Sequence, residues 1–209
     1  MRYLPDLFAR NRAWAAARVA EDPGYFQRLC ELQAPRHLWI GCADSRVPAN
    51  QIVGLEPGEL FVHRNVANVF DPADPNAVSV LQYAVEVLRV EHVIVCGHYG
   101  CGGVLAAFER GLEPPLEGWI DHIRRVRVAH LAELDALEDR DARWRRLCEL
   151  NVAAQEAAVC STGVVQAAWA RGQELVVHGW IYDLRDGLLR DLELSVAKPP
   201  GRGAGSMGR

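Results

Sequence analysis

Short runs of apolar residues bounded by turn residues mark the strands expected in this chain. They cover 37–41, 60–63, 92–96 and 174–180. Near-continuous apolar runs of this length are typical of strands that are buried on both faces, as in a parallel sheet. A last strand over 188–196 follows Asp186-Gly187, a dipeptide typical of a hairpin turn, so we expect it to run antiparallel to the strand before it.

Stretches with helical spacing of apolar residues separate the predicted strands. In 77–90 apolar residues recur at intervals of three or four, and Asp74-Pro75 precedes them as a start signal. Further helices are expected over 24–33, from Gly102-Gly103 onward, twice within 118–160 with a break near Asp139, and over 162–171. This alternation predicts an α/β fold with a mostly parallel central sheet, flanking helices and one antiparallel edge strand.

The two ends of the chain differ from the middle. Residues 6–20 have helical spacing but many arginines, and Asp22-Pro23-Gly24 ends the pattern. We expect 1–22 to form an N-terminal helical arm that packs on a partner and 23–197 to form a single α/β domain. The glycine-rich segment 198–209 has too few apolar side chains to pack, so a disordered tail is expected there.

The composition is that of an ordinary globular protein, with 209 residues, 50% hydrophobic and 24% charged. A net charge of -4 gives no basic surface for nucleic acid or for an acidic membrane, so neither is expected as a partner. No apolar stretch has secretory or membrane-spanning length, which favours a cytoplasmic location. Without an export signal most cysteines should be reduced, and we interpret four as core residues: Cys30, Cys96, Cys148 and Cys160.

Cysteine and histidine residues lie where two of the predicted strands end. Cys42 directly follows one apolar run, and His98 and Cys101 follow another. In open α/β sheets, ligands bind beyond the carboxyl ends of the strands, so these side chains are expected to meet at one edge. Two thiolates and an imidazole are donors that zinc takes in catalytic sites, with a fourth position left open. The sequence therefore predicts a zinc site, with Asp44 and Arg46 beside it.

Other interpretations of these residues remain open at this point. The glycine-rich turn 97–103 lies between a strand and a helix, as phosphate-binding turns do, but its spacing fits neither the dinucleotide fingerprint nor the P-loop. His98 could instead be a core histidine, although a position among glycines after a strand is poorly suited to that. His178 also approaches a strand end and competes as a ligand, but its place inside an apolar run favours a structural role.

Three segments together resemble the β-class carbonic anhydrases. They are Cys42-Ala43-Asp44-Ser45-Arg46, Arg64-Asn65-Val66-Ala67-Asn68 and Cys96-Gly97-His98-Tyr99-Gly100-Cys101-Gly102-Gly103. The resemblance extends from about residue 25 to residue 195. It implies that Cys42, His98 and Cys101 bind zinc. It also implies that Asp44 and Arg46 form the dyad that lies beside the metal in that family.

The resemblance also implies an activity and an assembly. The activity is the reversible hydration of CO2 to bicarbonate and a proton by hydroxide on zinc. The assembly is a homodimer whose arms wrap the partner, often paired into a homotetramer, and this would account for the predicted helix over 6–20.

One subgroup of the family holds an inhibitory bicarbonate between a tryptophan, an arginine and a tyrosine. Trp39, Arg64 and Tyr182 occupy the matching places, so the chain resembles this bicarbonate-regulated, type II subgroup. The alternative is that Trp39 is a core residue and Tyr182 packs in a loop, because both residue types are common in half-buried strands.

The charges of the implied ligands predict how such a site would behave. Two thiolates cancel the charge of Zn²⁺, so the bound water should be less acidic than in a three-histidine site, and activity should rise with pH. The Asp44 carboxylate competes with hydroxide for the open position, and a bidentate pair with Arg46 would keep it away. We expect bicarbonate bound at the second site to favour the closed arrangement, with Asp44 on zinc.

Two other functions stay open on the sequence alone. The same zinc site could hydrolyse another small heterocumulene such as CS2. Alternatively, a permanently closed site would belong to a zinc-holding or thiol-regulated binding protein. Asp44 and Arg46 argue against a purely structural zinc, which needs four fixed ligands and no arginine beside the fourth.

Overall fold

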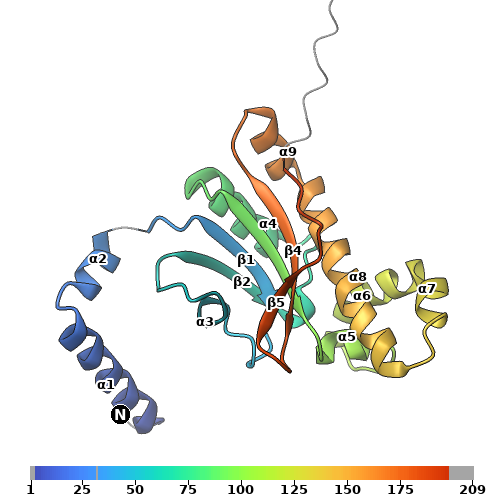
Figure 1. Cartoon of the computed structure of the whole chain (residues 1–209), viewed down its shortest axis with the longest axis horizontal. Helices are drawn as coiled ribbons and strands as arrows, with labels where there is room; N and C mark the ends of the chain where they lie inside the picture. Colours follow the sequence, from blue (N-terminus) through green and yellow to red (C-terminus); the bar gives the residue numbers. More distant parts are fainter. Residues whose placement is uncertain (1–2, 32, 198–209) are drawn as a thin grey trace, which may run out of the picture.

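The computed structural model describes residues 3–31 and 33–197, and a five-stranded sheet forms its centre (Figure 1). The strands are β1 (His37–Cys42), β2 (Leu60–Asn65), β3 (His92–His98), β4 (Val176–Asp183) and β5 (Leu188–Asp191). Their order is β2-β1-β3-β4-β5, with the first four parallel and β5 antiparallel to β4. The predicted α/β class, the mostly parallel sheet and its antiparallel edge strand are confirmed.

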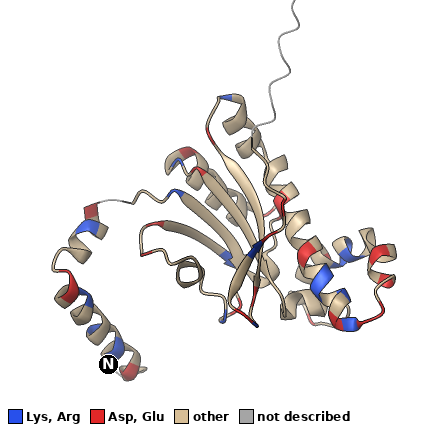
Figure 2. Ribbon diagram, viewed as in Figure 1, with Lys and Arg blue, Asp and Glu red and all other residues tan. Residues whose placement is uncertain are grey.

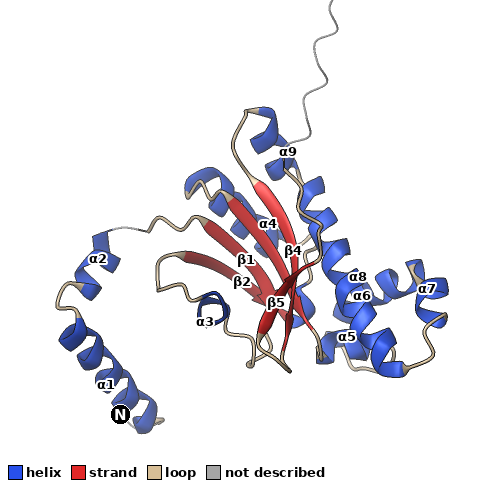
Figure 3. Cartoon of the chain, viewed as in Figure 1, coloured by secondary structure: helices blue, strands red, loops and turns tan. Residues whose placement is uncertain are grey.

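Helices lie on both sides of this sheet and at its ends (Figure 3). Their bounds are α1 (Pro5–Glu21), α2 (Tyr25–Glu31), α3 (Ala49–Val53), η1 (Val66–Asn68), α4 (Pro75–Gln82), η2 (Tyr83–Val87), α5 (Gly102–Ala106), α6 (Leu116–Ala129), α7 (Leu131–Asp135), α8 (Arg140–Ser161) and α9 (Gly163–Ala170). Asp74 acts as the predicted start signal, since its side chain accepts a hydrogen bond from the backbone N–H of Asn76. Asp139, where the helical pattern was expected to break, caps α8 in the same way through the N–H of Ala142.

Three details of the prediction were wrong. The stretch 118–160 contains α6, α7 and α8 rather than two helices, because a kink at His130 separates α6 from α7. The last strand ends at Asp191, since Glu193 takes a positive φ of 58° and leaves only one isolated bridge, between Val177 and Val196. The short helix α3 was not predicted.

The central strands β1 and β3 are buried on both faces, as their apolar runs predicted, whereas β4 alternates buried with half-buried residues and β2 and β5 are partly exposed. On one face, strand residues pack against α4, α8 and α9 in a fully buried cluster that includes Leu38, Ile40, Val93, Val95, Leu81, Val152 and Val165. On the other face a smaller cluster contains Trp39, Ala49, Leu60, Ile94 and Cys96. Burying each large apolar side chain contributes about 1.5–3 kcal/mol, so these clusters hold the strand ends in fixed positions.

The N-terminal helices contact the rest of the chain little. None of the residues of α1 is buried, and Figure 1 shows α1 and α2 extending away from the sheet. Trp14 on α1 packs edge-on against Tyr25 and Phe26, which joins these two helices to each other. Cys30 on α2 is exposed, so its interpretation as a core residue was wrong. Cys96 and Cys148 are buried, and Cys160 is partly buried against the larger cluster.

Both acidic and basic residues occur along α1 and α2 and over α6 to α8 in the view of Figure 2. Among the described residues, no helix has the length and apolar character needed to cross a membrane. The predicted tail, 198–209, lies outside the described residues.

Candidate metal centre

The carboxyl ends of β1 and β3 bring the predicted ligands together. Cys42 is the last residue of β1 and His98 the last of β3, and these neighbouring strands are parallel, so both side chains lie at one edge of the sheet. Cys101 follows three residues later, at the start of α5. One donor atom from each residue lies within 4.8 Å of the other two, and the two sulfur atoms are 3.8 Å apart. All three residues are buried.

Two glycines allow this local geometry. Gly100 has a φ of 74°, a left-handed conformation that suits glycine and turns the chain back between His98 and Cys101. A Cβ atom on Gly97 would lie 2.6 Å from Cγ2 of Val152, so the absence of a side chain lets α8 approach β3. From the same helix the indole N–H of Trp144 donates to the carbonyl of Cys101 at 3.0 Å. Helix α8 therefore contacts the segment 97–101 at both of its ends, at Gly97 and at Cys101.

The hydrogen bonds of His98 leave one ring nitrogen for a metal. Its Nδ1 lies 3.0 Å from the carbonyl oxygen of Tyr99, and since that oxygen can only accept, Nδ1 carries the proton. Its Nε2 is buried and has no hydrogen-bond partner among the described residues. A buried nitrogen lone pair facing two sulfurs is costly unless a cation binds there, and this donor set is one that zinc prefers. The residues present therefore fit zinc.

The two cysteines share a proton when no metal separates them. The contact with Cys101 lowers the pKa of Cys42 to about 4, and His98 acts in the same direction against the effect of burial. The same contact, with burial, raises the pKa of Cys101 far above its usual range. At neutral pH the pair thus holds one thiolate and one thiol.

Asp44 and Arg46 form a bidentate ion pair beside the three ligands. Nε and Nη2 of Arg46 donate to Oδ1 and Oδ2 of Asp44 at 2.9 and 2.7 Å, and the backbone N–H of Arg46 donates to Oδ1 at 2.9 Å. The Arg46 bonds hold the pKa of Asp44 well below its usual range, although partial burial opposes this. Oδ2 of Asp44 lies 3.8 Å from Nε2 of His98. An ionised carboxylate therefore stands next to the candidate metal position.

Trp39, Arg64 and Tyr182 lie on one face of the sheet. Trp39 is fully buried in the smaller cluster, and Tyr182 packs against that cluster from β4, so Tyr182 is a strand residue and not a loop residue. Arg64 on β2 is paired with Gly41, two residues from Trp39, and shares its face with Leu60 of the same cluster. Among the described residues, neither the indole N–H of Trp39 nor the hydroxyl of Tyr182 has a hydrogen-bond partner.

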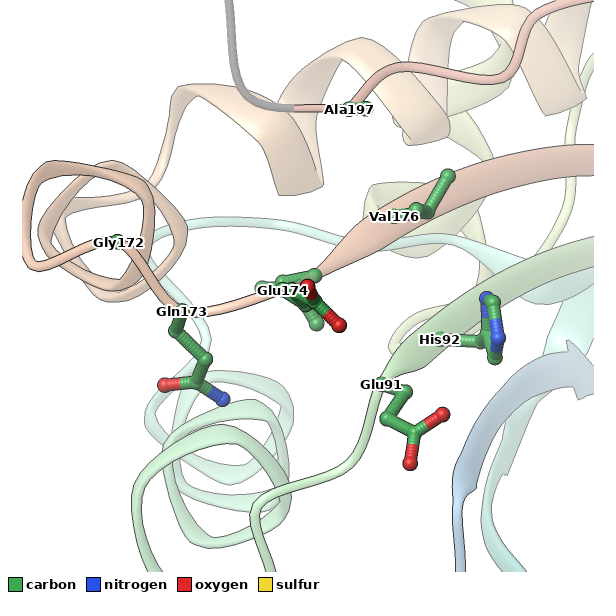
Figure 4. A pocket seen from close by; sticks show the side chains of 8 residues that line it. Glu91, His92, Gly172, Gln173, Glu174, Val176 and Ala197 are labelled. Atoms are coloured by element: carbon green, nitrogen blue, oxygen red, sulfur yellow. The ribbon is translucent and has the colours of Figure 1, made fainter.

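His178 is not near the three ligands. Its Nε2 contacts Nδ1 of His92 at 3.1 Å and its Nδ1 contacts Oγ of Ser195 at 2.8 Å. A cavity of about 390 Å³ lies beside His92. Figure 4 shows Glu91 and Glu174 near it, at the amino ends of β3 and β4. This hollow is at the opposite edge of the sheet from His98. A structural role for His178 agrees with these contacts.

Several contacts of the site were not predicted. Arg64 donates to the backbone carbonyls of Cys42 and Asp44 at 2.7 and 2.6 Å. The buried Asn151 of α8 donates to the carbonyl of Ala67, a residue with a positive φ of 65°, at 2.9 Å. No spacing in the sequence joins α8 to the segment after β2, so only the folded chain shows this pairing.

Fold and site together define an α/β protein with a three-ligand metal site at the carboxyl edge of a parallel sheet. The family model for carbonic anhydrase matches residues 37–189. A carbonic anhydrase of Emericella nidulans is 48% identical over 197 residues, which cover 92% of this chain and 86% of that protein. The chain belongs to the β-carbonic anhydrase family, and it is an enzyme.

Solved structures agree with this assignment. A β-carbonic anhydrase from Coccomyxa in complex with acetazolamide has a TM-score of 0.89 at 42% identity, covering 94% of this chain and 89% of that one. One from Sordaria macrospora, described as tetrameric, has a TM-score of 0.88 at 38% identity, covering 91% and 97%.

Proposed function

We propose that this enzyme catalyses the reversible hydration of CO2 to bicarbonate and a proton, with zinc held by Cys42, His98 and Cys101. The unpartnered Nε2 of His98, buried against two cysteine sulfurs, is the observation that carries this proposal. When bound, zinc acts as a Lewis acid that acidifies water and so supplies hydroxide for attack on CO2.

Asp44 and Arg46 are proposed to control access to the open position of the metal. Because Arg46 binds both carboxylate oxygens, Asp44 remains ionised and turned toward Arg46, where it can accept a hydrogen bond from a reacting hydroxyl group and orient it. If that pair broke, the carboxylate could serve as a further ligand to a metal held by the three residues, since its Oδ2 lies 3.8 Å from Nε2 of His98. Asp44 is thus proposed as a fourth ligand in a closed state.

Bicarbonate is proposed to inhibit the enzyme at Trp39, Arg64 and Tyr182. This assignment is supported by two donors without acceptors, the Trp39 indole and the Tyr182 hydroxyl, on the same face of the sheet as a guanidinium. A planar anion with several acceptor oxygens suits such a set.

The Tyr182→Phe variant tests the inhibitory site, because it removes one donor and keeps the ring. We expect the bicarbonate concentration for half inhibition to rise about fivefold to tenfold, the effect of losing one hydrogen bond to a charged group. Tyr83→Phe, at an exposed residue of η2, is the matched control. Unchanged inhibition in Tyr182→Phe would count against the site.

The assembly is proposed to be a homodimer or a homotetramer, in which α1 packs on another copy. Support comes from the lack of buried residues in α1 and from the tetrameric relative of Sordaria macrospora.

The hydration activity is tested by stopped-flow measurement of CO2 hydration with Cys101→Ser. A hydroxyl is a poor zinc ligand in place of a thiolate, so both zinc content and activity should fall below about a tenth of the parent values. Cys30→Ser, at an exposed cysteine outside the site, should match the parent. Full activity in Cys101→Ser would overturn the assignment of the ligands.

A further inference from the structure

The guanidinium of Arg64 is already occupied by the backbone next to the zinc ligands. Its Nε donates to the carbonyl of Cys42 at 2.7 Å and its Nη2 donates to the carbonyl of Asp44 at 2.6 Å. We propose that Arg64 is a positioning residue that clamps the backbone of residues 42–44, so that the Asp44 carboxylate stays paired with Arg46 and away from the metal.

The carbonyls of Cys42 and Asp44 lie where the backbone pairing of β1 with β2 ends, so a side chain is needed to hold this segment to β2. The pairing of β1 with β2 ends at Cys42 and Asn65, and the N–H of Ala43 makes the last bond to β2, with the carbonyl of Asn65 at 2.7 Å. Beyond that point the segment leaves the sheet. The two donors of Arg64 then bind one carbonyl on each side of Ala43, so they extend the attachment of the segment to β2.

This clamp fixes the direction of the Asp44 side chain. The carbonyl of Asp44 also accepts from the N–H of Val47 at 3.0 Å, and the carboxylate accepts from the N–H of Arg46 at 2.9 Å. When Arg64 holds the backbone carbonyl of Asp44, the carboxylate of the same residue is therefore directed toward Arg46. Hydrogen bonds from a charged donor are among the stronger ones, so losing two of them should shift the balance between the two positions of Asp44 tenfold or more, on the order expected for such bonds.

The clamp also suggests how an anion would act, and this step rests on the proposed inhibitory site. Nη1 of Arg64 has no partner among the described residues, whereas Nε and Nη2 are engaged. An anion between Trp39 and Tyr182 attracts the guanidinium and competes with the two carbonyls for its donors. Binding of the anion therefore weakens the clamp and favours the closed arrangement of Asp44.

The clamp and a simple anion-binding role predict opposite effects for Arg64→Met. Without the clamp, the rate of CO2 hydration at low bicarbonate should fall about tenfold or more, in line with two lost bonds to a charged donor. If Arg64 only binds the anion, that rate stays at the parent value and only the inhibition disappears, which would overturn the proposal. Arg64→Lys keeps the charge but cannot bind both carbonyls with one planar group, so its rate of CO2 hydration should lie between those of the parent and of Arg64→Met.

Backbone hydrogen exchange at residues 43–47 gives a second readout that does not need activity. In Arg64→Met the amides of this segment should exchange about tenfold faster, in zinc-free and in zinc-loaded protein alike. Arg143→Met is the matched control, because Arg143 also donates to a backbone carbonyl, that of Leu137 at 2.5 Å, away from the site. It should change neither exchange at 43–47 nor activity.

Unchanged exchange at 43–47 in Arg64→Met overturns the clamp, whatever the activity. If Arg64→Met does not fold, Arg64→Lys decides by the same measurement, with faster exchange supporting the clamp and unchanged exchange overturning it. If the parent enzyme failed to hydrate CO2, the proposed function would fail, while exchange in zinc-free protein would still test the clamp.

Discussion

The chemistry of this enzyme depends on the protonation of a few side chains. His98 carries its proton on Nδ1, which leaves Nε2 for the metal, and Arg46 keeps Asp44 ionised. The cysteine pair is different, because one of its two protons remains at neutral pH. Binding of zinc must therefore displace a proton.

This proton gives a pH dependence for zinc affinity. Because the pKa of Cys101 is raised far above neutral while that of Cys42 is lowered to about 4, zinc displaces about one proton from the pair between pH 6 and pH 8. The affinity should rise with pH, by about tenfold per unit for one released proton. Competition with a chelator, corrected for protonation of the chelator, measures this. An affinity that does not change with pH would contradict the shared proton.

At the scale of elements, most of the site could be predicted from the sequence. The apolar runs before Cys42 and His98 located the strand ends, and parallel strands place their carboxyl ends at one edge. Short elements were not predictable, because α3 has only five residues and no hydrophobic period. The bonds from Arg64 to the carbonyls of Cys42 and Asp44 depend on the side-chain conformation of an arginine, for which a sequence pattern carries no signal.

The contact between β3 and α8 gives a prediction about stability. In Gly97→Ala the new methyl group would lie 2.6 Å from Cγ2 of the buried Val152, so α8 must move away from β3. Such overpacking should lower the free energy of unfolding by about 1–3 kcal/mol, measured by urea unfolding of zinc-saturated protein.

Gly118→Ala is the control for this substitution. Gly118 lies in α6 and a Cβ atom there would meet nothing within 4 Å, so alanine should leave stability unchanged or raise it by about 0.5–1 kcal/mol. Equal stability of Gly97→Ala and Gly118→Ala would show that α8 does not pack as closely as described.

In the whole molecule, α1 is the longest helix that buries none of its residues against the rest of its own chain among the described residues. Leu7 and Phe8 are 57% and 45% exposed, and Trp14 and Val19 of the same helix are also exposed, so α1 carries a group of exposed apolar side chains of the kind found at interaction surfaces. A second copy that covers this helix would bury them, as the proposed dimer requires. In Figure 1, α1 and α2 extend away from the sheet, where a second copy could contact them.

The arm is tested by introducing charge at its apolar residues. The double variant Leu7→Glu with Phe8→Glu should shift the protein from oligomer to monomer, because two carboxylates cannot be buried without partners. Sedimentation velocity measures the mass. Arg12→Glu, at an exposed residue of the same helix, should keep the parent mass. A parent protein that is already monomeric, or a double variant of parent mass, would argue against assembly through α1.

We propose that zinc held by Cys42, His98 and Cys101 gives this chain its carbonic anhydrase activity. The most direct measurement is a titration of metal-free protein with zinc, followed by stopped-flow CO2 hydration at alkaline pH. Activity should rise linearly and stop rising at one zinc per chain, in keeping with the single three-ligand cluster among the described residues. A protein that binds one zinc per chain and still does not hydrate CO2 would contradict it.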